Sequence, residues 1–355
     1  MQSRKVTLAN NMVLNSSRSN SIDLPMDSII NQIRIRVTGT YSGMDGNLTA
    51  EFPFNIFRTI TVKSGKGAFP YSIASKDIRI LNYLDKAGKV TSSATGGNFE
   101  MNLILDRGEL LALKQNQLPD VIDHPSIPFN SLTLAVIWAQ DADIGSSNAI
   151  TAATAEVEVE QTPITIPELQ AIYGEKLERY QLIEVYTKGD VVINTNTKPS
   201  QAIILDVGRL KKRTITVTSD SSSPPVRSST IVTELQLNNQ KTGYERTPID
   251  RTFKTIQNED AEQYNLATIL AGVASIDYPQ EINNDPYGFP SWRLGDKDFS
   301  IYTQNASNGN IRVIEEQRIV NINAFESGDI LGVITGSFGK AAPTPATSNS
   351  GAKQP

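Results

Sequence analysis

Few residues of this chain are of the types that usually perform enzyme chemistry. Its 355 residues include no cysteine and a single histidine, His124. Thiol catalysis, iron–sulfur centres and metal sites built from several Cys or His are therefore excluded. A catalytic triad would have to combine His124 with Asp120 or Asp123 and with Ser126, which are too close in sequence for more than local capping. The chain also has no Gly-x-Ser-x-Gly elbow, so we interpret His124 as a hydrogen-bonded loop residue.

Three short segments resemble ligand-binding loops only weakly. Asp141-Ala-Asp-Ile-Gly145 and Asp296-Lys-Asp298 have alternating carboxylates, but neither continues with the further acidic ligands of a calcium loop. Lys63-Ser-Gly-Lys-Gly67 lacks the spacing of a phosphate-binding loop. We interpret all three as solvated turns. The sequence therefore assigns no catalytic, cofactor-binding or metal-ligating residue and implies no cofactor.

Charged residues alternate with apolar ones in two segments. Arg34 and Arg36 lie between Ile33, Ile35 and Val37, and Glu156, Glu158 and Glu160 flank Val157 and Val159. In strands, this spacing places the charges on one face and the apolar residues on the other. Two interpretations are open: solvated outer faces of sheets, or charge complementarity between lobes or subunits. Lys211-Lys-Arg213 is a small basic cluster that could touch lipid headgroups or genome, but with little affinity.

The two tryptophans are expected in different environments. Trp138 alternates with small and apolar residues in a strand pattern, which predicts a place in the core. Gly288–Trp292 follows a polar stretch, which predicts a loop with exposed or interface aromatics. Two interpretations are open for this loop, a subunit contact or a ligand platform.

Composition indicates a globular chain. The net charge is −5, the sequence pI is about 5.2, and 39% of the residues are hydrophobic. This acidic balance is unlike that of most nucleic-acid-binding proteins. No segment has 18 uninterrupted apolar residues, and the first residues lack the apolar stretch of a signal peptide. The three Asn-x-Ser/Thr sequons, at Asn15, Asn47 and Asn305, therefore carry little weight, and we expect a soluble protein made in a reducing cytosol.

Short runs rich in Val, Ile, Thr and Leu, separated by polar turns, predict an all-β sandwich or barrel with few helices. The expected strands are Ile33–Val37, Phe57–Lys63, Phe99–Leu105, Leu132–Trp138, Glu156–Glu160, Thr214–Thr218, Ile231–Leu237, Phe299–Thr303, Arg312–Glu315 and Ile330–Ile334.

Three helices are expected among these strands. Ser75 is a candidate N-cap for Lys76–Ala87, which places Ile78, Leu81 and Leu84 on one face before Gly88. A second helix begins near Pro167 and has its apolar stripe from Leu169 to Tyr180. Asn258 is a candidate cap for a third helix over Glu259–Ala271, before Gly272.

The order of the expected elements repeats after about 180 residues. Val13 is matched by Val192, Ile22 by Ile203, Ile35 by Ile215, and Ile56–Val62 by Ile231–Leu237; the first helix is matched by the third. The repeat predicts two similar lobes. We expect an N-terminal domain of residues 1–163, a C-terminal domain of residues 164–340 that opens with a short helix, and a flexible polar tail of residues 341–355.

This organisation resembles the double jelly-roll major capsid proteins of membrane-containing icosahedral viruses, the tectivirus and adenovirus lineage. The resemblance covers the chain from about Val6 to Ile334. It rests on the order of the expected elements and their local sequence pattern, and no sharp signature motif supports it. The segments that carry it are Ile22–Thr40, Phe57–Lys63, Tyr71–Ala87, Leu132–Trp138, the Pro167 helix, and Gly288–Trp292 before Phe299–Tyr302.

The resemblance implies two tandem eight-stranded jelly rolls and a structural role without catalysis. Family members form homotrimers with a pseudo-hexameric outline, and these trimers tile an icosahedral shell around an internal lipid membrane. The implied partners are further copies of the chain, neighbouring trimers, and penton or minor capsid proteins. Met1–Ser21 and the tail after Gly339 are candidates for contact with membrane lipids, and no direct contact with nucleic acid is expected. The implied location is the virion, after assembly in the host cytoplasm.

Two other functions remain open at this stage. One is a tandem β-sandwich module that binds glycans or receptors, as a virion spike does. The other is a glycopeptide hydrolase of the peptide:N-glycanase kind, in which carboxylates act in the cleft between two jelly rolls. No acidic pair in this sequence can be assigned to such a cleft.

Overall fold

The structure is a computed structural model, and it describes most of the first half of the chain and the strand-forming parts of the second half. The described residues are 4–8, 11–64, 71–85, 91–106, 124–125, 131–163, 165, 167–168, 182–193, 200–202, 209–221, 225–237, 250–277, 289–290, 299–303 and 308–319. Within these ranges, no helix has both the length and the apolar composition needed to cross a membrane.

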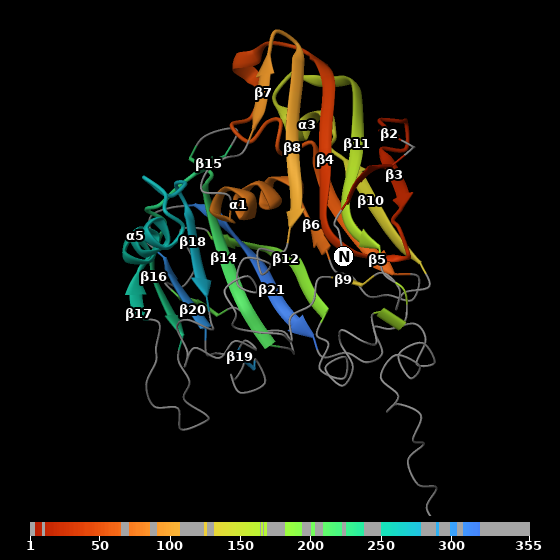
Figure 1. Ribbon diagram of the computed structural model, residues 1–355. Coiled ribbons are helices and arrows are strands. Elements are labelled where there is room, and N and C mark those ends of the chain that lie inside the picture. The colour runs from red at the N-terminus through yellow and green to blue at the C-terminus, as the bar shows by residue number, and fades with distance from the viewer. Residues whose placement is uncertain are drawn as a thin grey trace, which may run out of the picture.

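Lobe one, formed by the described residues of 4–163, contains a seven-stranded antiparallel sheet (Figure 1). The order in space is β1 (Arg4–Thr7), β11 (Ala149–Pro163), β4 (Ser28–Ser42), β8 (Asn98–Asp106) and β7 (Ser92–Thr95). Two short strands extend it: β2 (Met12–Val13) beside β11, and β9 (His124–Pro125) beside β4. The predicted strands around Ile35, Phe99 and Val157 all belong to this sheet.

A ten-stranded sheet runs through both lobes. Its part in lobe one consists of β3 (Ser19–Asp23), β10 (Leu132–Trp138), β5 (Phe57–Ser64) and β6 (Tyr71–Ile73). Its part in lobe two, formed by the described residues of 182–319, consists of β12 (Leu182–Ile193), β21 (Gly309–Ile319), β14 (Arg209–Ser219), β15 (Val226–Arg227), β18 (Val273–Asp277) and β19 (Phe289–Pro290). The two parts join where β6 pairs with β12 in parallel, with Tyr71 opposite Val185.

Lobe two also contains a four-stranded sheet, and short helices connect strands in both lobes. The sheet has the order β13 (Ser200–Ala202), β20 (Phe299–Thr303), β16 (Val232–Leu237) and β17 (Asp250–Thr252). The helices are α1 (Ser75–Asp85), α3 (Asp141–Ile144) and α5 (Phe253–Gln263), with a 3-10 turn η1 at Asp45–Asn47.

The internal repeat is confirmed by the strand pairing, because the central pairings of lobe one recur in lobe two. In lobe one β4 pairs with β11, β8 and β9, and in lobe two β14 pairs with β21, β18 and β19. Likewise β5 pairs with β10 and β6, and β16 pairs with β20 and β17. A helix follows in each case: α1 after β6 and α5 after β17. The two lobes therefore share one scheme of central strand pairings.

The core of lobe one lies between its two sheets. Ile35 and Val37 of β4 are fully buried, as are Val157 and Val159 of β11, because the period of two directs these side chains inward. Leu134 of β10 is also fully buried. The predicted burial of Trp138 is confirmed: its ring packs 4.6 Å from that of Phe57, and its Nε1 donates a 2.6 Å hydrogen bond to Asn20.

The first predicted helix is confirmed as α1, although its cap was assigned wrongly. Ile78, Leu81 and Leu84 are all buried, but they do not share one face: Ile78 and Leu81 pack into the core of lobe one, and Leu84 belongs to a separate cluster with Val273. Ser75 is the first residue of α1, and its hydroxyl bonds with the backbone of Phe54 and Phe57 instead of capping the helix. This hydroxyl ties α1 to the start of β5.

The third predicted helix begins earlier than the sequence indicated. Helix α5 starts at Phe253, where Thr252 is the N-cap and its hydroxyl accepts a hydrogen bond from the N–H of Thr255. Asn258 is therefore an exposed residue inside the helix, and α5 ends at Gln263, well before Ala271. Gly272 therefore does not end this helix; it has a positive φ of 66° in the segment just before β18.

Some predicted elements cannot be compared with the structure. At the expected second helix, Thr165 and the carboxylate of Glu168 are hydrogen bonded as in a capping box beside Pro167, but residues 169–181 lie outside the described part. Gly88, Trp292, the strand Ile330–Ile334 and the tail of residues 341–355 also lie outside it. The boundary between residues 163 and 164 therefore stays a prediction.

Candidate functional site at the junction of the lobes

The candidate site residues of the sequence do not lie together at one site. His124 pairs through its backbone with Ile30 in β4, so it belongs to a short strand and not to the expected loop. Asp120, Asp123, Ser126 and residues 296 to 298 lie outside the described residues.

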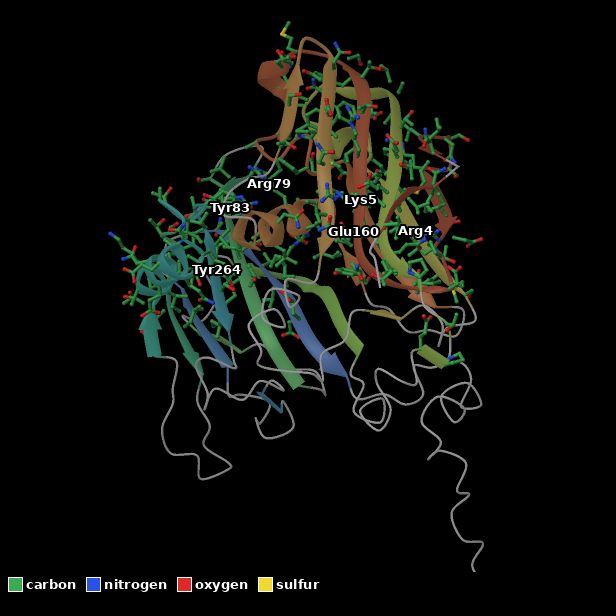
Figure 2. All side chains as sticks on the ribbon, viewed as in Figure 1. Arg4, Lys5, Arg79, Tyr83, Glu160 and Tyr264 are labelled. Atoms are coloured by element: carbon green, nitrogen blue, oxygen red, sulfur yellow. The ribbon has the colours of Figure 1, made fainter. Side chains whose placement is uncertain are left out.

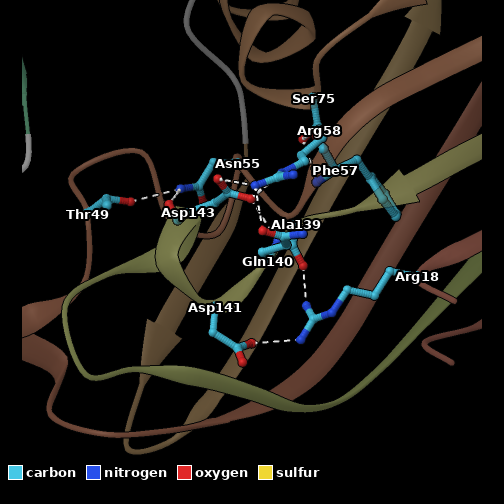
Figure 3. Close-up of polar contacts among 10 residues, drawn as sticks. All are labelled: Arg18, Thr49, Asn55, Phe57, Arg58, Ser75, Ala139, Gln140, Asp141 and Asp143. Carbon is cyan, nitrogen blue, oxygen red and sulfur yellow. Dashed lines mark hydrogen bonds and ion pairs between the residues drawn. The ribbon is translucent and has the colours of Figure 1, made fainter. Parts of the chain in front are cut away.

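The acidic pair Asp141 and Asp143 forms a helical turn, α3, in place of the expected solvated turn. Asp141 accepts a 2.9 Å hydrogen bond from Arg18, whose guanidinium also donates to the carbonyl of Ala139. Asp143 forms two hydrogen bonds with Arg58, of 2.5 and 3.1 Å, and caps α3 by accepting from the N–H of Gln140 (Figure 3). Each of these two carboxylates is therefore paired with an arginine of lobe one.

A cavity of about 520 Å³ lies at the junction of the two lobes. Its wall contains charged and polar side chains from both. The residues that matter here are Glu51, Asn55, Arg58, Asp77 and Asp143 of lobe one, and Thr216, Arg227, Asn310 and Arg312 of lobe two. The sequence places these residues more than 250 positions apart at the extremes, and only the fold brings them together.

Glu51 is the centre of an ion cluster that joins the lobes. Arg227 of β15 donates to both of its carboxylate oxygens, at 2.7 and 3.0 Å. Arg79 of α1 lies 3.2 Å from the same carboxylate and 4.5 Å from the ring centre of Phe54. Burial alone raises the pKa of Glu51, but the hydrogen bond and charge of Arg227, together with the charge of Arg79, outweigh it and lower that pKa below its ordinary value. Glu51 is therefore ionised near neutral pH.

A second ion pair crosses the junction at the start of α1. Arg312 of β21 lies 3.1 Å from Asp77, and the side chain of Asp77 is only 1% exposed. A carboxylate this deeply buried is stable in the ionised form only with a close cation or strong hydrogen bonds. Arg312 and Asp77 therefore constrain how β21 sits against α1.

Helix α1 also makes an apolar contact with lobe two. Ile80 and Leu84 form a buried cluster with Val273 of β18. Tyr83 and Tyr264 pack against this cluster, and the hydroxyl of Tyr83 donates a 2.9 Å hydrogen bond to the carbonyl of Thr268 (Figure 2). Ile78, on the opposite side of α1, packs into the core of lobe one. Helix α1 is therefore buried on both sides, between the lobes.

The carboxylates of the cavity are poorly suited to acid–base catalysis. Glu51, Asp77 and Asp143 are each paired with arginine. Burial raises the pKa of Asp143, but the hydrogen bonds from Arg58 and from the backbone of Gln140 lower it further than burial raises it. A general acid at neutral pH needs the opposite, a raised pKa. The arrangement instead fixes the relative position of two lobes.

Arg34, Arg36 and the glutamates of residues 156–160 lie on neighbouring strands of one sheet. Arg36 is directly opposite Glu156, and Arg34 is opposite Glu158 at 3.8 Å. Arg36 also lies 3.0 Å from Glu100 of β8. These charges form a partly exposed, mixed-charge outer face of lobe one, and their nearest charged neighbours are in the same sheet. For Lys211-Lys-Arg213, the structure describes only the backbone, as part of β14.

Sequence reasoning missed the junction residues Glu51, Asp77, Arg79, Arg227 and Arg312. None of them lies in a recognisable motif. One signal was available. Helix α1 carries Ile80 and Tyr83 in addition to the predicted apolar stripe, so its apolar surface is wider than that of a helix with one solvent-exposed side.

Comparison with solved structures finds the same arrangement of two lobes in viral capsid proteins. The major capsid protein of STIV, the Sulfolobus turreted icosahedral virus, superposes with a TM-score of 0.69 at 17% identity, covering 91% of this chain and 98% of that one. This chain has the double jelly-roll fold. The major capsid protein P2 of bacteriophage PM2 matches this double jelly roll with a TM-score of 0.52 at 12% identity, covering 90% of this chain and 98% of that one. No protein-family model and no curated protein sequence matches it.

These matches confirm the expected fold class, which is mostly β with a few short helices and two tandem jelly rolls. In the double jelly roll, lobe one and lobe two are the two sandwiches, α1 lies between them, and α5 lies at the outer side of lobe two (Figure 1). At these identities the likeness concerns the fold.

Proposed function

We propose that this double jelly roll is a viral major capsid protein that forms pseudo-hexameric homotrimers, which tile an icosahedral shell around an internal lipid membrane. One observation carries the proposal: the main strand pairings of lobe one, around β4 and β5, recur in lobe two around β14 and β16. Three chains with two similar lobes each present six similar edges, as hexagonal packing requires. The similarity in fold to the STIV and PM2 major capsid proteins supports the same conclusion.

The junction supports a building block that acts as one body. The ten-stranded sheet continues from lobe one into lobe two through β6 and β12, and the cluster around Glu51 and the Asp77–Arg312 pair cross the same boundary. Such a block is able to transmit the geometry of one edge to another, because packed cores and sheets resist small deformations. The proposed role involves no catalysis.

The remaining parts of the proposal concern partners and location. The chain binds copies of itself, then neighbouring trimers and penton or minor capsid proteins. Its termini contact lipids of the internal membrane, and it does not bind nucleic acid directly. It is located in the virion after assembly in the host cytoplasm. Residues 1–163 form the first jelly roll, residues 164–340 the second, and residues 341–355 a flexible tail.

The oligomeric state of the purified chain tests this proposal. We expect light scattering after size exclusion to give a mass near three times 38.8 kDa, about 116 kDa, and negative-stain images to show a hexagonal outline. A stable monomer at all accessible concentrations would contradict the proposal. Such a monomer would direct attention to glycan arrays and glycopeptide substrates, which test the spike and hydrolase alternatives.

A further inference from the structure

Helices α1 and α5 occupy equivalent positions in the two lobes, 178 residues apart. In lobe one, the amide of Asn82 bonds with both the N–H and the carbonyl of Ile104 in β8, at 2.9 and 2.6 Å. In lobe two, Asp260 accepts a 2.6 Å hydrogen bond from the N–H of Ser275 in β18. The two strands are equivalent in the repeated pairing scheme, so the same turn of each helix is fastened to the same strand.

The outward sides of these two equivalent helices differ in exposure. In α1, Asp77, Ile80 and Leu84 are each only 1% exposed, because lobe two covers them. The equivalent residues of α5 are Thr255, Asn258 and Glu262, and all three are exposed. Among the residues that the structure describes, no lobe covers the side of α5 that corresponds to the buried junction in lobe one (Figure 1). We call Lys254, Thr255, Asn258 and Glu262 the α5 outer face.

The surface that α1 contacts in lobe two also has an equivalent, in lobe one. It includes Thr216, which is paired with Arg312 on one side and Val273 on the other. In lobe one the residue equivalent to Thr216 is Arg36, which is paired with Glu156 on one side and Asn102 on the other.

Exposure differs here in the same way. Thr216 is 7% exposed and Val273 is fully buried, whereas the side chain of Arg36 is 56% exposed. Figure 2 shows Lys5 and Glu160 on the same sheet. We call Arg34, Arg36, Asn102, Glu156 and Glu158 the sheet outer face.

Each chain therefore contains one complete junction, from α1 to lobe two, and two unpaired halves of a second junction. We propose that the α5 outer face of one copy docks on the sheet outer face of a second copy. The occupant is a second copy because the contact it would make is the one that the chain already makes between its own lobes. This inference rests on the proposed capsid function and names the surface through which the copies associate.

The contact is heterologous, since the two surfaces are different and each chain carries one of each. Heterologous contacts either close into a ring or continue as a filament. In a closed trimer, contacts within and between chains alternate, and all lobes have equivalent neighbours. The geometry therefore accounts for three chains forming one pseudo-hexagonal block.

The chemistry of the two faces suits association after folding. Within the chain the junction uses Ile80, Leu84 and Val273, which never meet water once the chain has folded. The equivalent positions in the proposed contact are Asn258, Glu262 and Asn102, which keep a free chain soluble. Both faces carry charges of both signs, so the association should weaken as salt rises.

Cysteine cross-linking tests the contact directly, because the natural chain has no cysteine. Ile80 and Val273 belong to one apolar cluster within the chain, and their equivalents are Asn258 and Asn102. The double variant Asn258→Cys/Asn102→Cys should therefore form disulfide-linked dimers and trimers under mild oxidation. The matched control is Gln263→Cys/Asn102→Cys, which places an exposed cysteine on α5 about 140° around the helix from Asn258. We expect at least fivefold less cross-linked product from this control.

Single variants separate a heterologous contact from a symmetric one. Mixing Asn258→Cys with Asn102→Cys should give linked dimers, whereas each variant alone should give none. Dimers from Asn258→Cys alone, or equal cross-linking in the Gln263→Cys control, would overturn the assignment.

Light scattering of the natural chain keeps the two proposals distinguishable. If the chain is a trimer but the Asn258→Cys/Asn102→Cys variant does not cross-link, the docking surface is wrong and the capsid proposal stands. If the natural chain stays monomeric, both are overturned.

Discussion

At the scale of single residues, Glu51 pairs with two arginines, Arg227 of lobe two and Arg79 of lobe one. Replacing it with Gln removes the charge that compensates Arg79 and Arg227, both largely buried. Loss of one partner of such a pair costs about 2–4 kcal/mol of unfolding free energy. Urea denaturation of Glu51→Gln should show this loss. Glu158→Gln is the matched control, because its pair with Arg34 is exposed and should contribute at most about 1 kcal/mol.

The difference in stability between the natural chain and Glu51→Gln should depend on pH. The pKa of Glu51 is lower in the folded chain than in the unfolded chain, where it is about 4.3. The ionised carboxylate therefore stabilises the fold above that pH, and its contribution is lost as pH falls through the lower folded pKa. Between pH 7 and 3 the natural chain should lose stability more steeply than Glu51→Gln. Parallel curves for the two would contradict the assignment.

Alternation of apolar residues predicted the inward positions of Ile35, Val157 and Trp138, because the period of two is a local property of a strand. The partners of Glu51 could not be predicted in this way. They depend on how two lobes meet, and an arginine in a polar segment gives no sign of whether it will be exposed or buried against another lobe.

At the scale of elements, α5 shows where local reasoning fails. Its buried side includes Gln257 and Asp260, which bond to the backbone of β18 and interrupt the apolar period that would have revealed the helix start. The cap was therefore assigned to Asn258 instead of Thr252. By contrast α1, with buried Ile78, Leu81 and Leu84, starts at Ser75, one residue before the predicted start at Lys76.

A pair of alanine variants checks this correction. Thr252→Ala should cost about 1 kcal/mol of unfolding free energy, because the N–H of Thr255 loses its partner. In the dissociated chain, Asn258→Ala should be neutral or slightly stabilising, since Asn258 is exposed in the helix interior and alanine has the higher helix propensity. Thermal unfolding of both variants under one buffer condition is sufficient. A larger loss for Asn258→Ala than for Thr252→Ala would contradict the boundary of α5.

At the scale of the whole molecule, the repeat predicted two similar lobes, and the common pairing scheme confirms them. The sequence did not predict that one sheet runs through both lobes, because the parallel contact of β6 with β12 is short: among the described residues it pairs Tyr71 with Val185 and Ser72 with Tyr186. So short a contact leaves no pattern in the sequence.

The joined lobes should unfold as one cooperative unit, and Ile80 offers the means to separate them. Ile80→Asn places a polar side chain in the apolar cluster with Leu84 and Val273, which should cost about 3 kcal/mol or more. Because Ile80 faces lobe two while Ile78 faces the core of lobe one, the loss should weaken the junction more than either lobe. Calorimetry should therefore show one transition for the natural chain and two for Ile80→Asn. Ile137→Asn, at an exposed position of β10, is the matched control and should keep a single transition. One transition for Ile80→Asn, shifted to lower temperature, would mean that the continuous sheet alone couples the lobes.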